Sequence, residues 1–446
     1  MVNVPLARQK YLKHLERNSN QKEKKRLLEF SNYLNGKNIV IVGPAGYLEG
    51  KGRGEWIDSF DVVVRMNLAL PVQHPKDYGT RADILYTFAT RLWAEHWVDC
   101  SHLKGLSWVV ITTGKEPYIS RFRGALPKGV QMRKMTKEFY RSMNKAVICT
   151  SNTGTTAISD LLTFGVKSIT VVGFDYYASG YHSGYGGDGD PGNHVFRNQL
   201  AYMSILVNQE NRLIFDEALK SAITNALTIQ DEEVCTKEFS LLIPYVKTDD
   251  HRHRTYSWLM RRYQEMFPNA EVCIGESKPF NRAKAINNAA SKATKDIFII
   301  TDADALFTVE LVDKAFDAFR ENCVKVKNVV CDIEKESTKE LLASDGVDAC
   351  LIINRIRPAN FFMLISRKQF EDVGGFDEGF TEWGGEDNAF LKVLRLTYGE
   401  FDYCTGGIYH LWHPESEGSK SFKQSSAYKR WQKYVKAKTL RDIKRI

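Results

Sequence analysis

The sequence lacks the long apolar run that a membrane-spanning helix requires. No stretch of the 446 residues approaches the roughly 20 consecutive apolar residues that cross a bilayer. Residues 1–28 are basic and follow a helical pattern, but they contain no apolar core of the kind found in a secretory signal. We therefore expect a cytoplasmic protein without a transmembrane segment.

Closely spaced cysteines are also missing. The eight cysteines are scattered along the chain, and none of them forms a C-x-x-C pair. This spacing disfavours a zinc site built on thiolates and predicts reduced thiols in a cytosol. The sequence gives no indication of the oligomeric state.

Composition and charge are ordinary overall but uneven along the chain. Hydrophobic residues make up 43% and charged residues 26%, as in a globular protein of two or three domains. Of the net charge of +8, residues 1–230 carry an excess, with 29 basic against 20 acidic side chains. Such an excess is either a solvated face or a surface for an anionic partner, such as nucleic acid, an anionic glycan or a membrane.

The first half alternates short apolar runs with helical patterns. The runs at 38–46, 61–67, 108–112, 146–149 and 168–175 are predicted strands, and 155–165 is a predicted helix. This alternation predicts a mostly parallel sheet whose ligands lie beyond the carboxyl ends of the strands, where Asn67, Thr153 and Asp175 fall. Gly43-x-x-Gly46 resembles a loop whose N–H groups face a phosphate, although Pro44 removes one of them.

Ordered motifs in residues 38–200 resemble the sialyltransferases of glycosyltransferase family 29. Segments 41–48 (Ile-Val-Gly-Pro-Ala-Gly-Tyr-Leu), 54–58, 63–67 and 77–81 are similar to that family's large sialylmotif. Segments 152–154 (Asn-Thr-Gly) and 171–175 (Val-Val-Gly-Phe-Asp) are similar to its small motif. Tyr181 and His182 resemble the third motif, and His194 resembles the very small motif.

This resemblance implies a donor site for a CMP-linked or related nucleotide sugar. It makes His194 the general base and His182 a contact of the donor phosphate, and it places four more residues at the donor: Gly43, Asn67, Thr153 and Gly154. Without the resemblance, His194 is read as a loop histidine with a structural hydrogen bond. Two departures fall on donor positions: Pro44-Ala45 replaces Asn-Ser, and Gln199 replaces Glu.

The second half is centred on residues 298–305, Phe-Ile-Ile-Thr-Asp-Ala-Asp-Ala. An apolar run, typical of a buried strand, stops at Asp302 and Asp304. Alternation puts the two carboxylates on the same side of the strand end, where they can hold a divalent cation that neutralises a diphosphate. For an isolated D-x-D the alternative is a solvated acidic turn.

Further motifs lie in the same half of the chain. A strand at 239–245 contains Pro244, a helix begins near Asn281 and Arg282, and Trp383-Gly-Gly-Glu-Asp387 opens another helix. Strands are also predicted at 271–275, 362–366 and 407–413, and helices at 256–267 and in the tail from 420. Together with the D-x-D, residues 239–415 resemble GT-A glycosyltransferases of the galactosyltransferase and chondroitin-synthase type, which are also similar to family 2 enzymes.

The second resemblance implies a UDP-sugar donor and Mn²⁺ or Mg²⁺. Asp304 would hold the cation, Asp302 the ribose or the cation, and Arg282 the diphosphate, with Pro244 and Asn281 in the donor site. A histidine of the last strand would complete the metal site. His410 and His413 are predicted to lie on opposite strand faces, so that only one of them reaches the cation, and His413 is preferred.

Acceptor chemistry is assigned to the Trp383–Asp387 motif. Asp387 would be the general base and Glu386 would position the acceptor, which gives inversion. Trp383 would offer an aromatic face to a sugar or lie in the core. Acidic residues are also routine in a first helical turn, which is the alternative for Glu386 and Asp387.

The expected fold is α/β with two domains: a Rossmann-like, sialyltransferase-type sheet, regarded as a GT-A variant, and a GT-A nucleotide-sugar transferase fold. The predicted boundaries are 1–36 (basic helical segment), 37–230, 231–238 (linker), 239–415 and 416–446 (helical tail). The leading hypothesis is a bifunctional glycosyltransferase that builds a surface glycan or capsule in a bacterial cytoplasm. One alternative is a phage-type transferase that acts on hydroxymethylated DNA bases in its host; another is a non-catalytic, acceptor-binding first half.

Overall fold

The structure is a computed structural model that describes most of the chain. The described residues are 21–90, 100–185, 195–228, 234–320, 322–326, 329–344, 351–358, 360, 362–414 and 422–444. The chain divides into two compact units, Met1–Leu227 and Thr228–Ile446. Among the described residues, no helix has both the length and the apolar composition needed to cross a membrane.

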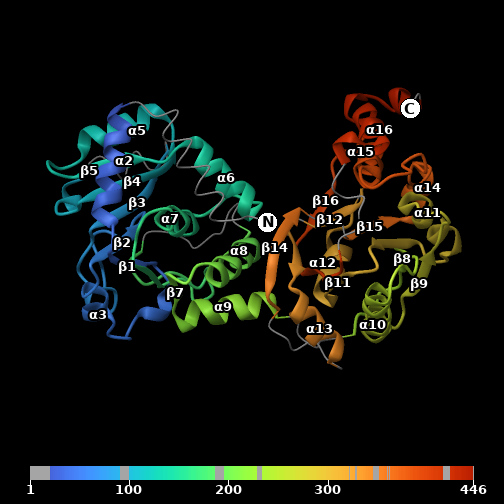
Figure 1. Cartoon of the computed structure of the whole chain (residues 1–446), viewed down its shortest axis with the longest axis horizontal. Coiled ribbons are helices and arrows are strands. Elements are labelled where there is room, and N and C mark those ends of the chain that lie inside the picture. The colour runs from blue at the N-terminus through green and yellow to red at the C-terminus, as the bar shows by residue number, and fades with distance from the viewer. Residues whose placement is uncertain are drawn as a thin grey trace. The chain divides into compact units, whose positions relative to one another are not determined.

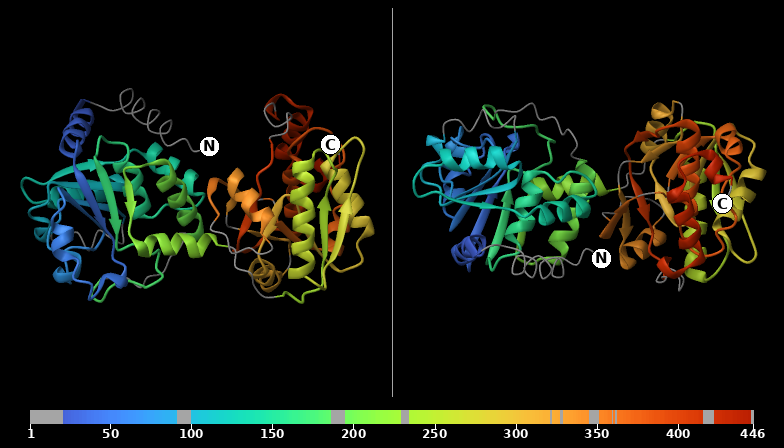
Figure 2. Two further views of the ribbon diagram at one scale, coloured as in Figure 1. Left: turned by 60° about the horizontal axis from the view of Figure 1, so that its bottom comes forward. Right: turned by 90° about the horizontal axis from the view of Figure 1, so that it is seen from above.

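The first unit contains a seven-stranded parallel sheet (Figures 1 and 2). The strand order is β5-β4-β3-β2-β1-β6-β7, so the direction of winding reverses between β1 and β6. The strands are β1 (Asn38–Val42), β2 (Val62–Met66), β3 (Ile84–Ala89), β4 (Trp108–Gly114), β5 (Gln131–Lys134), β6 (Ser168–Val172) and β7 (Leu213–Phe215). Ligands in sheets of this kind bind beyond the carboxyl ends of the strands at such a reversal.

Helices pack on this sheet through apolar faces at helical spacing. In α6, for example, Phe139, Met143 and Val147 are buried at intervals of four residues. The described helices are α2 (Gln21–Leu34), α3 (Gly54–Asp58), α4 (Pro75–Tyr78), α5 (Glu116–Ala125), α6 (Lys137–Val147), α7 (Thr153–Leu161), α8 (Phe196–Gln209) and α9 (Glu217–Leu227), with short 3₁₀ turns η1 (Gly46–Leu48) and η2 (Ser101–Leu103).

The strand predicted at 146–149 is wrong. Val147 is the last residue of α6, and Ile148 ends the helix in the left-handed conformation with a φ of 54°. A four-residue apolar run does not distinguish a short strand from the buried end of a helix. Residues 213–215 form the edge strand β7.

The second unit contains two sheets. The six-stranded mixed sheet has the order β16-β12-β15-β10-β8-β9, and the four-stranded sheet has the order β11-β17-β13-β14. The first is built from β8 (Ser240–Pro244), β9 (Glu271–Gly275), β10 (Ile297–Thr301), β12 (Val324–Val326), β15 (Phe362–Ser366) and β16 (Asp402–Cys404). The second is built from β11 (Ala305–Phe307), β13 (Val329–Ile333), β14 (Ile353–Pro358) and β17 (Ile408–His410).

The D-x-D segment is the link between these sheets, because Asp302–Asp304 join β10 of one sheet to β11 of the other. The described helices of this unit are α10 (Asp250–Met266), α11 (Arg282–Lys292), α12 (Val309–Ala318), α13 (Lys335–Ala343), α14 (Arg367–Asp372), α15 (Glu386–Tyr398), α16 (Ser426–Lys436) and α17 (Leu440–Ile443). In the tail, Ala427 and Tyr434 of α16 are buried against Phe380 and Ala389.

Candidate functional site

Three side chains of the second unit converge at the link between its sheets. The carboxylate of Asp304 lies 3.6 Å from Nε2 of His410 and 3.2 Å from Nε2 of His413. One ligand atom from each residue lies within 4.8 Å of the other two. The three side chains are 13–16% exposed, so the cluster is screened from solvent but reachable.

The expectation that only one histidine could reach Asp304 is wrong. It assumed a strand through residue 413, whereas β17 ends at His410. His410 pairs with Ala305 across the sheet, and the N–H of Leu411 donates to the carbonyl of Asp304 at 2.9 Å. The chain then leaves the strand, so the alternation of faces stops and His413 turns back to the same carboxylate.

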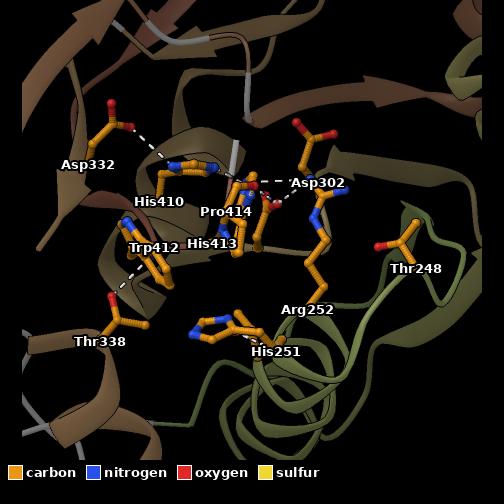
Figure 3. A network of polar contacts seen from close by, with 12 residues as sticks. Thr248, His251, Arg252, Asp302, Asp332, Thr338, His410, Trp412, His413 and Pro414 are labelled. Carbon is orange, nitrogen blue, oxygen red and sulfur yellow. Dashed lines mark hydrogen bonds and ion pairs between the residues drawn. The ribbon is translucent and has the colours of Figure 1, made fainter. Parts of the chain in front are cut away.

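A carboxylate outside the cluster orients His410. Asp332 lies beside His410 in the parallel pair of β13 and β17, and its Oδ1 is 3.2 Å from Nδ1 of His410 (Figure 3). Asp332 is itself bound by Arg355 and Arg357, at 2.6 and 2.8 Å. No local signal in the sequence predicts this role, because the strand pairing joins residues 78 positions apart.

Both histidines therefore present the same nitrogen to Asp304. Nδ1 of His413 lies 2.7 Å from the carbonyl of Pro414, which can only accept a hydrogen bond. A carboxylate at Asp332 likewise makes Nδ1 of His410 a donor. When neutral, each ring then has its lone pair on Nε2, facing Asp304, which is the arrangement that oxygen partners impose on metal-binding histidines. When His413 is protonated, its Nε2 donates to Asp304 instead.

Charge in this cluster is strongly coupled. Burial disfavours an ionised Asp304, but the hydrogen bond from His413 and the positive charges around it outweigh burial and hold the pKa of Asp304 below its usual range. Burial lowers the pKa of His413, and the hydrogen bond and charge of Asp304 raise it by more. The pKa of Asp332 is also lowered, because the hydrogen bond with His410 and the charge of Arg357 exceed the effect of burial.

Arg252 completes the cluster and was not predicted. It lies in the first turn of α10, and its Nη2 is 3.5 Å from Oδ2 of Asp304 and 3.4 Å from Nε2 of His413 (Figure 3). Asp249 caps this helix and accepts from the backbone N–H of Arg252 at 2.8 Å. The residue was visible in sequence only as part of a basic stretch, Asp249 to Arg254.

A second charged group adjoins the first through the D-x-D. Arg282, at the start of α11, lies 2.7 Å from Asp302 and 3.1 Å from Glu386. Burial alone would lower the pKa of Arg282, but the charges of Asp302 and Glu386 raise it above its usual value. Burial is the main reason that the pKa of Glu386 is raised, and its buried Oε2 has no hydrogen-bond partner among the described residues. Asp302 is thus engaged by Arg282, whereas Asp304 faces the histidines.

The structure also gives the positions of the remaining predicted residues of this unit. Oδ2 of Asp387 accepts from Asn360 at 3.0 Å, a contact the sequence did not predict. Trp383 is 58% exposed and packs edge-to-face on Phe422, so it is not a core residue. Asn281 caps α11, with its amide group donating to the carbonyl of Glu378, and Pro244 is the buried end of β8.

The first unit has a cavity at the reversal between β1 and β6. Its lining includes Asn67, Thr153 and Gly154, as predicted, together with aromatic side chains. The full lining is Pro44, Ala45, Met66, Asn67, Asn152, Thr153, Gly154, Gly173, Phe174, Asp175, Tyr176, Tyr177, Gly180, Tyr181 and Tyr185. Among these described residues only Asp175 is charged. Gln199 does not line the cavity itself but holds a residue that does, because its Oε1 accepts from the N–H of Asn152 at 3.1 Å.

The phosphate-facing loop expected at Gly43-x-x-Gly46 is not formed. The N–H groups of Gly43, Ala45 and Gly46 donate to the carbonyls of Val172, Gly173 and Gly180 at 2.8–3.0 Å, and Pro44 has none. Gly43 serves packing instead. A Cβ there would lie 2.1 Å from the carbonyl oxygen of Gly173, so only glycine allows β1 and β6 to approach this closely.

His182 is not among the described residues that line the cavity, although its neighbours Tyr181 and Tyr185 are. It packs on Tyr78 and groups with Glu49 and His74, a set whose geometry could hold a metal. Ser183 already makes hydrogen bonds with all three side chains at 2.6–2.9 Å, so this set is a hydrogen-bonded group. The predicted base His194 lies outside the described residues.

Two family models match the sequence. Residues 6–120 match glycosyltransferase family 29 (sialyltransferase), and residues 360–414 match the N-terminal domain of galactosyltransferase. Both are glycosyltransferase families, so the two resemblances and the enzyme class predicted from the sequence are confirmed. A search of curated proteins gives no match.

Solved structures with similarity to the chain include both kinds of enzyme. A mammalian sialyltransferase is 14% identical over 47% of this chain and 84% of its own, with a TM-score of 0.30. The sialyltransferase CstII from Campylobacter jejuni, in complex with a substrate analogue, is 14% identical over 41% and 80%, with a TM-score of 0.31. The catalytic domain of a Drosophila β1,4-galactosyltransferase, in complex with xylobiose, is 15% identical over 46% and 83%, with a TM-score of 0.28.

Proposed function

We propose that the second unit transfers a sugar from a UDP-sugar to a hydroxyl of a glycan, with inversion and with the help of a divalent cation. The observation that carries this proposal is the convergence of Asp304, His410 and His413 next to the Arg282–Asp302–Glu386 group. One carboxylate and two imidazoles suit Mn²⁺ better than Mg²⁺, which prefers oxygen ligands. A cation held there supplies charge stabilisation to the departing diphosphate.

The protein's own groups would carry the remaining steps. Arg282 presents a planar fork that can bind phosphate or keep Asp302 in place for the donor. Asp387 would take the proton of the acceptor hydroxyl, with its carboxylate held by Asn360. Glu386, held by Arg282, would position the acceptor, and the exposed ring of Trp383 would stack on a sugar.

For the first unit we propose a sialyltransferase-like site for a CMP-linked or related sugar, at the cavity beyond β1 and β6. Its support is the lining by Asn67, Thr153 and Gly154. A metal plays no part in this assignment, because the described lining is neutral apart from Asp175 and offers hydrogen bonds from amides and hydroxyls. The two units would act in succession on one growing surface glycan or capsule.

The test is nucleotide release by the full chain from a panel of UDP- and CMP-sugars, with Mn²⁺ and with EDTA. We expect Asp304→Ala to abolish Mn²⁺-dependent UDP release, a loss of at least about a hundredfold, because the cation loses its only carboxylate ligand. Asp317→Ala, on the exposed side of α12, removes the same charge and should leave release unchanged. UDP release that persists in EDTA would contradict the metal assignment.

A further inference from the structure

Arg252 places a permanent positive charge against two of the three atoms proposed to hold the cation. Its Nη2 lies 3.5 Å from Oδ2 of Asp304 and 3.4 Å from Nε2 of His413, and these two atoms are 3.2 Å apart. A cation bound to both atoms sits about 2 Å from each of them. A guanidinium and a divalent cation would then compete for the same pair of lone pairs.

We propose that Arg252 is an internal counter-ion that occupies the metal cluster while the donor is absent and transfers to the donor diphosphate when cation and nucleotide bind. This inference rests on the proposed function of the second unit. It adds a coupling between the two ligands to that function. The cation is held weakly until the nucleotide arrives and gives Arg252 another anionic partner.

The position of Arg252 supports the second half of this exchange. It stands in the first turn of the 17-residue helix α10, where the partial positive charge of the helix disfavours a basic side chain unless an anion is nearby. His251, in the same turn, packs edge-to-face on Trp412, and Arg252 points from this helix end to Asp304 and His413 (Figure 3). Such a helix end is suited to a phosphate.

The mobility needed for the exchange is also available. The backbone of Arg252 is fixed by the cap from Asp249, but its side chain is 33% exposed, and Asp304 and His413 are the partners of its guanidinium. The long side chain can therefore turn without disturbing α10. A planar fork with two parallel donors matches the oxygens of a diphosphate.

The experiment measures Mn²⁺ binding to the full chain by the electron paramagnetic resonance signal of free Mn²⁺, without and with UDP. We expect Arg252→Gln to bind Mn²⁺ about tenfold more tightly than the wild type without UDP, and to lose most of the coupling between Mn²⁺ and UDP. UDP titration in saturating Mn²⁺ should show an affinity about tenfold weaker, since the fork is gone.

Two further variants separate charge from shape. Arg252→Lys keeps the positive charge without the fork, so its Mn²⁺ affinity should stay near that of the wild type while its UDP affinity falls. Arg261→Gln removes a charge from the exposed side of the same helix and should change neither affinity.

The outcomes distinguish the inference from the function on which it rests. Equal or weaker Mn²⁺ binding by Arg252→Gln without UDP overturns the counter-ion role, while the metal site stands if Asp304→Ala still abolishes binding. A wild-type protein that binds no Mn²⁺, with or without UDP, overturns both.

Discussion

In the proposed function both units recognise a nucleotide sugar, but their candidate sites are built from opposite kinds of residue. The site of the second unit is a set of linked charges drawn from the link between β10 and β11 and from β13, β17, α10, α11 and α15. The cavity of the first unit is lined by amides, hydroxyls, glycines and aromatic rings, and Asp175 is the only charged residue of its described lining. One site is held by electrostatics and the other by close packing.

This difference predicts different vulnerabilities. A charged network transmits the loss of one member to its neighbours, because each pKa depends on the partners that remain. A packed cavity tolerates the loss of a distant charge but not an added methyl group. This contrast would be contradicted if variants showed that the charged site behaves like a packed cavity, or that the cavity behaves like a charged network.

The largest effect is expected in the charged network, from a residue outside the ligand set. Asp332→Asn keeps the size of the side chain but removes the charge that holds Nδ1 of His410 at 3.2 Å. Partners of this kind are typically worth 10–100-fold in metal affinity. We expect Mn²⁺ affinity to fall in that range, as measured by titration of the full chain with UDP present.

The matched control is Arg355→Gln, which removes one of the two arginines on Asp332 and leaves the bond to His410. Its Mn²⁺ affinity should stay close to that of the wild type, since Arg357 still holds the carboxylate. Unchanged affinity in Asp332→Asn would mean that His410 does not depend on this partner, and the second site would be less of a network than the comparison states.

The next effect is expected from the packed cavity. In Gly154→Ala, the new Cβ would lie 2.2 Å from Cε1 of Phe174, so the ring that lines the cavity must move. Overpacking of this kind costs about 1–3 kcal/mol. We expect CMP binding, measured by calorimetry, to weaken while Mn²⁺-dependent UDP release stays unchanged in the same preparation.

Gly124→Ala is the matched control, because a Cβ at that position of α5 meets nothing within 4 Å. It should keep CMP binding and UDP release as they are. Loss of UDP release in Gly154→Ala would show that the two sites do not work separately.

The sequence predicted the parts of the fold that depend on local pattern. The strand at Glu271–Gly275 and the strand at Phe362–Ser366 have the predicted bounds, since apolar runs between polar turns leave little choice. β5 was not predicted, because Gln131–Lys134 is mostly polar in sequence. β3 was also missed, although its apolar run at Ile84–Ala89 was a usable signal.

The sequence predicted less of the sites, because their geometry depends on contacts between distant segments. The D-x-D was found from the abrupt end of an apolar run, and Arg282 from its place in a motif. Asp332 and Arg252 join the cluster only through a strand register and a helix start far from the D-x-D. The face of His413 depends on where β17 ends, and alternation alone does not reveal that point.

The smallest effect is expected on the free energy of unfolding, and it tests whether the charged site lowers the stability of the protein. Burial raises the pKa of Glu386 above its unfolded value, helped by the charge of Asp387 and opposed by Arg282. The folded state therefore binds the proton more tightly, so stability is lost as the pH rises through the folded pKa. In urea denaturation with EDTA, Glu386→Gln should gain on the wild type toward neutral pH, by at most about 1 kcal/mol. Glu382→Gln, in the segment just before α15, should do the opposite. Hydrogen bonds from Ser426 lower the pKa of Glu382, and the wild type keeps that contribution until the pH falls through the lowered value. Parallel pH profiles for the two variants would show that burial does not destabilise the charged form of Glu386, and that this member of the charged site carries no cost in stability.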